Sequence, residues 1–238
     1  MIYQHDKKIN FYDLDAEGNM KLTALLKYIN DASWYSAEAI GVGMRDTLKY
    51  DMVFLMQRFG IKIFNIPKMD ETIKIRTWPG QSTRSAFKRQ GVICSAGDEV
   101  IIEWESLWVL IDINERRIKR PNQLPIEFPT YGKQGVEIAA KKIKIPTTTK
   151  LASYHHIVQY SELDVNGHMN NAIYADLVTN ILAKIEKHSM NSHKEVQFNY
   201  VNEAKLYDEI LVECHCSVDT IYITGICDEA VVFTAEIL

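Results

Sequence analysis

The chain has 238 residues, 47% of them hydrophobic, which is enough to bury a sizeable core in one large domain or in two of about 100–120 residues. The net charge of −4 gives no support to nucleic-acid binding, and no apolar run approaches the roughly 20 residues of a membrane span. The N-terminus lacks an apolar signal core and does not resemble a transit peptide, so a cytoplasmic location is expected.

The first half of the chain begins with a strand and a polar motif, followed by a helix predicted over Leu22–Ile40. Its apolar residues recur at helical spacing, and Gly41 suits the C-terminal stop. Gly97 and Asp98 supply a turn between the last two strand-like runs. The predicted strands are Met52–Ile66, Glu71–Trp78, Ser85–Ser95 and Glu99–Asp112.

The second half repeats this order of strand, motif, helix and strands. A helix is predicted over Asn171–Lys187. The predicted strands are Lys194–Val201, Glu209–Val218, Ile221–Cys227 and Ala230–Ile237. We therefore expect an N-terminal repeat at 1–120, a C-terminal repeat at 151–238, and a proline- and lysine-rich connection at 121–150 that packs along the surface.

Four cysteines in a chain of this length do not form a disulfide framework. The run Glu213–Cys216 resembles a zinc site, but in a strand its two cysteines face one way and His215 the other. His155 and His156 fail on the same geometry. We predict no metal and no cofactor.

The motif Tyr160–Asn171 carries the clearest chemical signal. Asp164, Asn166 and His168 stand on alternate positions, and in an extended segment this spacing turns all three side chains to one face. The helix expected behind them offers unpaired backbone N–H groups. Polar side chains and N–H donors that converge on one point are what cleavage of an activated carbonyl needs. An Asp–Asn pair ahead of a helix is equally typical of a cap or an Asx turn.

A second, altered copy of this motif lies at Tyr12–Met20. When Asp15 is aligned with Asp164, an offset of 149 residues, the glycines and methionines of the two copies also coincide. Glu17 and Asn19 then stand where the second copy has Asn and His. A period this long indicates a duplicated domain rather than a solenoid. Because the first copy lacks the histidine, we expect the chemistry in the second half.

A helix that is followed by four or more antiparallel strands can be buried when the sheet wraps around it. One such unit leaves a sheet edge exposed, and a second copy can cover that edge by pairing. The predicted fold is α+β, a tandem hotdog: two antiparallel sheets, each wrapped around a long helix, that form a pseudo-dimer within one chain.

Over nearly its whole length the chain resembles the acyl-acyl carrier protein (acyl-ACP) thioesterases of bacteria and plants. The D-x-N-x-H-x-N-N pattern alone also has relatives in single-domain hotdog thioesterases. Its combination with the other segments and the two-repeat length is far more specific. The matching segments are Leu163–Tyr174, Phe198–Ala204, Ile75–Gly80, Ser106–Asp112 and Arg116–Pro121.

The resemblance implies a catalytic set of Asp164, Asn166, His168 and, on the following strand, Glu203. Plant members have a cysteine after the glutamate, where this chain has Ala204, so a cysteine nucleophile at that position is excluded. Glu203 is then the candidate base or nucleophile, with Asn166 and His168 orienting the water. A rival assignment makes Asp164 the nucleophile, and the sequence does not separate the two.

Three further groups of residues complete the expected site. The helix start is expected to donate backbone N–H bonds to the carbonyl oxygen from Met169, Asn170 and Asn171. By resemblance the N-terminal repeat holds the acyl chain, with pocket candidates Met52, Phe54, Leu55 and Met56. At such apolar positions a role in the core is the commoner one. Basic clusters could seat the acidic carrier protein through Arg84, Lys88, Arg89, Arg116, Arg117, Lys119 and Arg120. The altered copy, Asp15, Glu17 and Asn19 with Asn65 near the place of Glu203, is expected to serve structure and substrate binding.

The resemblance implies hydrolysis of fatty acyl-ACP with release of free fatty acid. The partner would be acyl-ACP, with no nucleic acid and no membrane span, and the protein would be a monomeric pseudo-dimer or a homodimer. Alternatives are a coenzyme A thioesterase, a catalytically silent acyl-binding or regulatory protein, and a hotdog dehydratase. The sequence reveals neither acyl chain length nor branching preference.

Overall fold

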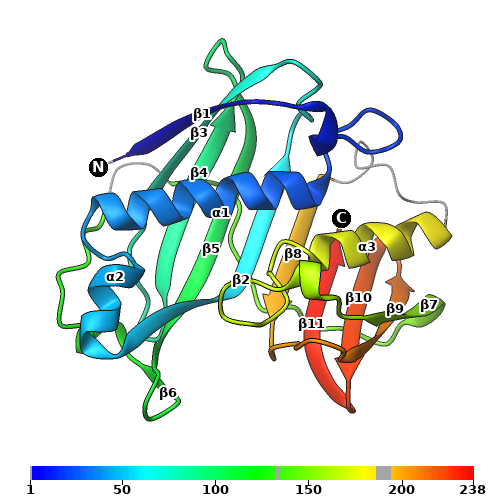
Figure 1. Cartoon of the computed structure of the whole chain (residues 1–238). Coiled ribbons are helices and arrows are strands. Elements are labelled where there is room, and N and C mark those ends of the chain that lie inside the picture. The colour runs from blue at the N-terminus through cyan, green and yellow to red at the C-terminus, as the bar shows by residue number, and fades with distance from the viewer. Residues whose placement is uncertain (1, 132–134, 186–193) are drawn as a thin grey trace.

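The computed structural model describes residues 2–131, 135–185 and 194–238. Within these ranges, eleven strands form one antiparallel sheet in the order β1-β3-β4-β5-β2-β8-β11-β10-β9-β7, with β6 paired to β5 (Figure 1). The strands are β1 (Tyr3–Lys8), β2 (Met52–Ile63), β3 (Thr72–Pro79), β4 (Phe87–Cys94), β5 (Val100–Asp112), β6 (Arg117–Lys119), β7 (Thr149–Ile157), β8 (Glu195–Tyr200), β9 (Glu209–Ser217), β10 (Thr220–Cys227) and β11 (Ala230–Ile237). The helices are α1 (Leu22–Ala39), α2 (Met44–Thr47), α3 (Tyr174–Lys184) and the short 3-10 turns η1 (Phe11–Asp13), η2 (Leu48–Tyr50), η3 (Pro121–Gln123) and η4 (Tyr160–Glu162).

The first long helix forms where the apolar spacing predicts it. Leu22, Leu26 and Ile29 are almost fully buried against the sheet, and the helix ends one residue before the predicted boundary. Gly41 follows with φ +72°, a left-handed conformation that glycine adopts at little cost. Among the described residues, no helix combines the length and apolarity needed to span a bilayer.

The second long helix begins three residues later than predicted, at Tyr174 instead of Asn171. The Asn170 side chain accepts a hydrogen bond from the Ala172 N–H (2.9 Å), and residues 171–173 form a turn before the helix begins. Asparagine competes in this way with helical backbone bonding, which the apolar spacing does not register. The predicted last residues of this helix, 186 and 187, lie outside the described residues.

The two repeats join through the central strands β2 and β8, which pair antiparallel with Phe59 opposite Phe198. Helices α1 and α3 lie on the same face of the continuous sheet, and their first turns meet where the Thr23 hydroxyl donates to Asp176 (Figure 1). Because β2 and β8 run in opposite directions, the segments that follow them leave the sheet at opposite ends. The predicted tandem hotdog fold is confirmed, with the sheets of the two repeats joined into one by β2 and β8. All eight predicted strands are present, with boundaries shifted by at most three residues.

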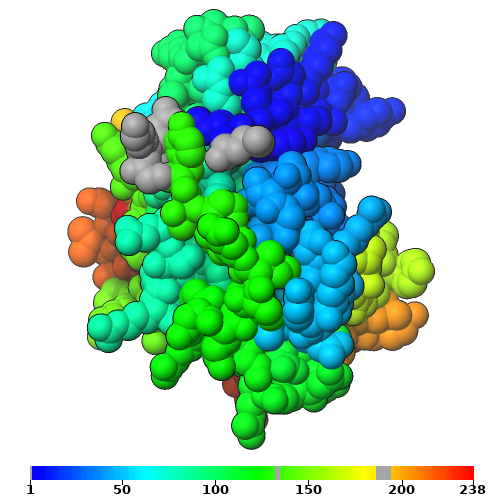
Figure 2. All heavy atoms as spheres, turned by 90° about the vertical axis from the view of Figure 1, so that its left-hand side faces the viewer, coloured from blue at the N-terminus to red at the C-terminus, as the bar shows by residue number. Residues whose placement is uncertain are grey.

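Part of the connection between the repeats crosses the sheet face opposite the helices. Gln197 on β8 accepts from the Lys141 N–H (3.2 Å) and donates to the Ala139 carbonyl (3.0 Å). Asn199 bonds the same stretch through the Ile143 N–H (2.9 Å) and the Lys141 carbonyl (2.9 Å). Figure 2 shows an earlier part of the connection, in green, along the side of the N-terminal repeat beside α2. Residues 132–134 of the predicted connection lie outside the described residues.

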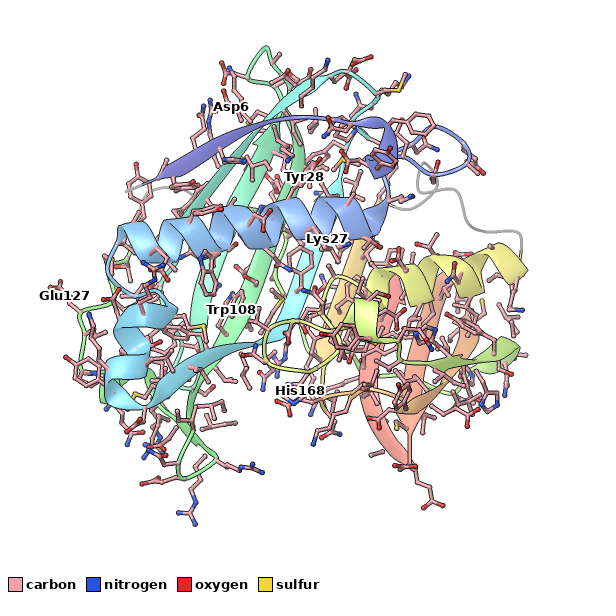
Figure 3. The ribbon with its side chains drawn as sticks, viewed as in Figure 1. Asp6, Lys27, Tyr28, Trp108, Glu127 and His168 are labelled. Atoms are coloured by element: carbon pink, nitrogen blue, oxygen red, sulfur yellow. The ribbon has the colours of Figure 1, made fainter. Side chains whose placement is uncertain are left out.

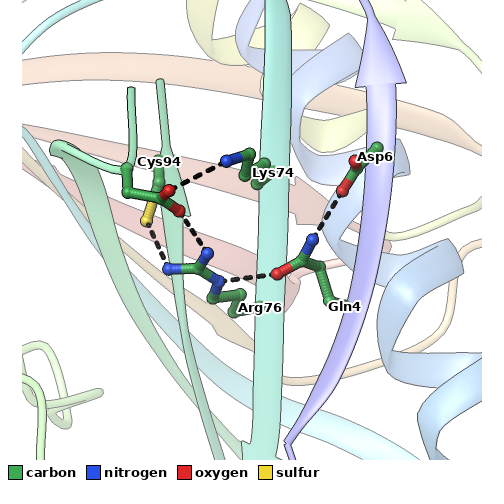
Figure 4. Close-up of polar contacts among 6 residues, drawn as sticks. Gln4, Asp6, Lys74, Arg76 and Cys94 are labelled. Carbon is green, nitrogen blue, oxygen red and sulfur yellow. Dashed lines mark hydrogen bonds and ion pairs between the residues drawn. The ribbon is translucent and has the colours of Figure 1, made fainter. Parts of the chain in front are cut away.

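The edge strand β1 is held to the rest of the sheet by a polar network (Figure 4). Arg76 on β3 donates to Gln4 (2.8 Å) and to Asp98, and Lys74 also binds Asp98 (2.9 Å). The hydrogen bonds from Lys74 and Arg76 lower the pKa of Asp98. The nearby Cys94 is almost fully buried, and burial raises the pKa of its thiol.

Candidate active site

The motif Asp164–His168 forms a tight turn, not the extended segment that the alternating spacing suggested. Leu163 and Met169 form an antiparallel bridge, and the Asp164 N–H donates to the His168 carbonyl (2.8 Å). Gly167 has φ +77°, which closes the turn. The three polar side chains of the motif therefore gather around one turn, because the backbone reverses between them.

The Asp164 carboxylate faces its own turn. Its Oδ1 atom accepts the Asn166 N–H (2.8 Å) and, over a longer distance, the His168 N–H (3.4 Å). The Asn166 side-chain amide lies 3.4 Å from the other carboxylate oxygen. These are the bonds of an Asx turn, so Asp164 fixes the positions of Asn166 and His168.

The structure brings His168 and Glu203 together although 35 positions separate them. His168 Nε2 lies 3.1 Å from Glu203 Oε2, with the side chains 28% and 51% exposed. The Met169 N–H donates to the Ala204 carbonyl (2.8 Å), and His168 forms a bridge with Lys205, so two backbone contacts draw this segment to the turn. In Figure 3, His168 lies below α1, at the end of the sheet from which β8 leads to Glu203. The pair can bind water and move a proton.

Two of the three expected N–H donors are already used within the chain. The Met169 N–H is taken by Ala204, as above, and the Asn170 N–H donates to the Glu162 carbonyl (2.9 Å). In the part of the chain that the structure describes, the Asn171 N–H has no acceptor. Of the three expected donors, the backbone N–H of Asn171 is therefore the one best placed to donate to a substrate oxygen.

Two tyrosines that the sequence analysis did not single out, the buried Tyr174 and the partly buried Tyr200, support this segment. The Tyr200 hydroxyl donates to the Asn171 carbonyl (3.2 Å), which orients the peptide next to the open N–H. Tyr174 packs against Tyr200 and Phe233. Burial raises the pKa of both hydroxyls, so they stay protonated and act as hydrogen-bond donors. The nearest sequence signal is the position of Tyr200 in the segment that carries the family resemblance.

The four acyl-pocket candidates do not share one environment. Met56 is buried in the main core, on the helix-facing side of the sheet. Met52 and Phe54 contact a separate apolar cluster around Phe87, which a part of the connection after β6 closes. Leu55 points to the other face and is 36% exposed. Met52, Phe54 and Met56 line the interior of the N-terminal repeat, and Leu55 does not.

The expected carrier-binding residues also differ in their environments: one is buried, two are ion-paired and the others are exposed. Arg89 was expected on the surface but is only 6% exposed: strand alternation turns it inward, where it donates to Ser36 (2.8 Å). Burial lowers its pKa to about 10. Lys88 faces outward and pairs with the buried Glu105 (3.0 Å), and Lys119 pairs with Asp112 and Glu115 (3.3 and 2.8 Å). The exposed residues of the set are Arg84, Arg116, Arg117 and Arg120.

The altered copy folds into the same turn at the other end of the sheet. Asp15 Oδ1 accepts the N–H groups of Glu17 and Asn19 (both 2.9 Å), and the Asp15 N–H donates to the Asn19 carbonyl (2.8 Å). Gly18 has φ +78°. Asn65 follows β2 as Glu203 follows β8, and it lines a hollow of about 270 Å³. The duplication inferred from sequence is therefore also a duplication of backbone structure.

These features define a double hotdog protein with one complete set of polar side chains. The chain is similar in structure to an acyl-ACP thioesterase from Bacteroides thetaiotaomicron (TM-score 0.82, 18% identity, covering 100% of this chain and 97% of that one). It is also similar to a putative oleoyl thioesterase from Lactobacillus plantarum (TM-score 0.83, 21% identity, 100% and 95%). At these identities the likeness confirms the fold.

Family matches give the assignment. Residues 1–123 match the acyl-ACP thioesterase N-terminal domain, and residues 145–230 match the C-terminal domain. The chain belongs to the acyl-ACP thioesterase family, a family of hydrolases. Among curated proteins it is similar to the chloroplastic dodecanoyl-[acyl-carrier-protein] hydrolase of Cinnamomum camphora, 21% identical over 192 residues, or 75% of this chain and 50% of that protein. The chain spans about half the length of the curated relatives it matches.

Proposed function

We propose that this protein hydrolyses the thioester of fatty acyl-acyl carrier protein and releases a free fatty acid. The observation that carries the proposal is the His168–Glu203 contact of 3.1 Å beside the Asp164 turn, in a chain of this family. A thioester is an activated carbonyl, so the enzyme has to place a water, polarise the carbonyl and protonate the leaving sulfur.

Glu203 is the group we assign as general base. It takes a proton from a water whose oxygen forms the new bond to the thioester carbon. The negative charge that develops on the carbonyl oxygen accepts the Asn171 N–H. When the C–S bond breaks, His168 takes up the proton that Glu203 removed from the water, across their 3.1 Å contact. It delivers that proton to the thiolate of the carrier's prosthetic group, so both residues return to their starting state. Asn166 helps to orient the water, and Asp164 holds the turn.

The Asx turn is the reason to prefer Glu203 over Asp164. Asp164 Oδ1 already accepts a close backbone hydrogen bond from Asn166, and Asp15 makes the same bonds in a copy that lacks the histidine. A carboxylate that holds a turn in both copies has a structural task that does not depend on the reaction. Glu203, by contrast, contacts His168 and is replaced by Asn65 in the other repeat.

The proposal is tested by measuring thiol release from acyl-ACPs of short to long chain length, alongside matched coenzyme A esters. We expect the carrier-bound substrates to be preferred, and the chain-length preference to appear in the same panel. Glu203→Ala and His168→Ala should each lower kcat about 100- to 10,000-fold. The matched control is Asn65→Ala, at the corresponding place of the other repeat, which should retain activity. A folded wild-type protein that releases thiol from neither carrier would overturn the proposal.

Exposed arginines at the β5–β6 turn are our candidates for docking the acidic carrier. β6 and His168 both lie in the lower half of the molecule in the view of Figures 1 and 3. The double substitution Arg116→Glu/Arg117→Glu should raise KM for acyl-ACP about tenfold at low salt and leave the coenzyme A ester unaffected, because only the carrier is recognised by charge. Equal effects on both substrates would argue against docking here.

A further inference from the structure

Glu162 ends the short turn η4 ahead of the catalytic motif, and its carboxylate is held by two donors. Glu162 Oε2 lies 2.9 Å from His156 Nε2 and accepts the Gln159 N–H (2.8 Å). Because an ionised carboxylate only accepts hydrogen bonds, the imidazole donates through Nε2. Both side chains of the His156–Glu162 pair are 19% exposed, so water competes weakly for this contact.

The same residue reaches the active-site segment through its backbone. The Glu162 carbonyl accepts the Asn170 N–H (2.9 Å). Asn170 stands between Met169, whose N–H is bound to Ala204, and Asn171, whose N–H is the open donor. A shift of Glu162 therefore moves the peptide that directly precedes the one presenting that donor.

His156 connects this arrangement to the sheet. It lies on β7, and Tyr154 on the same face of that strand donates to the Leu177 carbonyl of α3 (3.0 Å). Glu203 follows β8, which belongs to the same sheet. The loop that carries His168 and the segment that carries Glu203 are thus both attached to strands of one continuous sheet.

The N-terminal repeat makes the corresponding contacts with a different partner. The Asp13 carbonyl accepts the Lys21 N–H (2.7 Å), as Glu162 accepts Asn170, and Asp13 Oδ2 accepts the Asn10 N–H (2.8 Å). Its side-chain partner is the Tyr28 hydroxyl, which comes from α1 and not from the strand before the turn. The altered loop is anchored to its helix, whereas the loop with the histidine is anchored to the sheet that also bears Glu203.

We propose that His156 and Glu162 are positioning residues, which hold the Asn171 N–H and the His168 side chain in register with Glu203. This inference rests on the proposed hydrolysis, since it assigns the pair a task in that reaction. Neither residue touches the reacting atoms. They are expected to stabilise the transition state, in which the placement of the N–H donor matters most, and not to affect binding of the acyl chain.

The kinetic test compares the two anchors. His156→Ala and Glu162→Ala should lower kcat about 10- to 100-fold with KM changed by less than about twofold. Glu162→Gln should retain most activity, because its amide oxygen still accepts both hydrogen bonds. The matched controls Tyr28→Phe and Asp13→Ala remove the corresponding contacts in the other repeat and should leave kcat unchanged. Full kcat in His156→Ala and Glu162→Ala would overturn the proposal.

A second measurement needs no substrate. Hydrogen exchange of the Asn170 amide should become about 5- to 30-fold faster in His156→Ala, while the Lys21 amide keeps its wild-type rate. The reverse pattern is expected in Tyr28→Phe. If the wild type hydrolyses nothing, the proposed function falls and the exchange data alone decide whether the pair holds this segment. Unchanged exchange at Asn170 would overturn the positioning role.

Discussion

The two motif loops have one backbone and two sets of side chains. Each is closed by an Asx turn, at Asp15 and at Asp164, and by a glycine with φ close to +77°. One end of the sheet adds His168 and Glu203, 3.1 Å apart, whereas the other has asparagine at both corresponding places. The turn therefore does not depend on the chemistry, and an aspartate in it is not by itself a sign of catalysis.

The largest effect is expected when the active loop is made like the silent one. His168→Asn gives the C-terminal loop the residue of the N-terminal loop and leaves the backbone bonds of the turn intact. We expect kcat to fall about 100- to 10,000-fold, because asparagine does not protonate a leaving thiolate, with little change in Tm. Steady-state thiol release and thermal unfolding measure the two quantities. If the variant stays active, the histidine that distinguishes the two loops is not needed for hydrolysis.

A smaller effect is expected at Asp164. Comparing its asparagine and alanine variants distinguishes Glu203 as general base from Asp164 as nucleophile. Asp164→Asn keeps an oxygen that accepts the Asn166 and His168 N–H groups, so kcat should stay within about tenfold of wild type. Asp164→Ala removes that acceptor, and kcat should fall about 100-fold as the loop loses its geometry. If Asp164 were the nucleophile, the asparagine variant would be as inactive as the alanine variant. Asp15→Ala is the control, and it should affect stability alone.

Much of the fold could be predicted because period and duplication are properties of the chain itself. The apolar stripe of α1 and eight of the eleven described strands were expected within a few residues. The turn at Asp164 was interpreted as extended, because alternate polar residues fit a strand as well as an Asx turn. Arg89 was assigned to the surface by its basic neighbours, although alternation along β4, between the buried Phe87 and Ile93, already indicated the inner face.

The remaining features of the site depend on contacts between distant segments. The N–H groups of Met169 and Asn170 are not available to a substrate, because they donate to the carbonyls of Ala204 and Glu162. No local sequence pattern encodes those partners. The same holds for Tyr200 beneath Asn171. The pairing of Glu203 with His168 was expected from family resemblance, since their spacing in the sequence carries no geometric information.

The smallest effect is expected at the two glycines, where the two loops can be compared directly. Gly167 and Gly18 have φ of +77° and +78°, and a Cβ would meet no atom within 4 Å at either position. Alanine at each place therefore carries backbone strain of about 1–2 kcal/mol without a steric clash, and Tm should fall by a similar amount in both variants. Gly167→Ala should in addition lower kcat several-fold, because relief of the strain moves His168, whereas Gly18→Ala should not. Equal kcat in the two variants would mean that the turn tolerates distortion, and that His168 is held mainly by its contacts with Glu203 and Lys205.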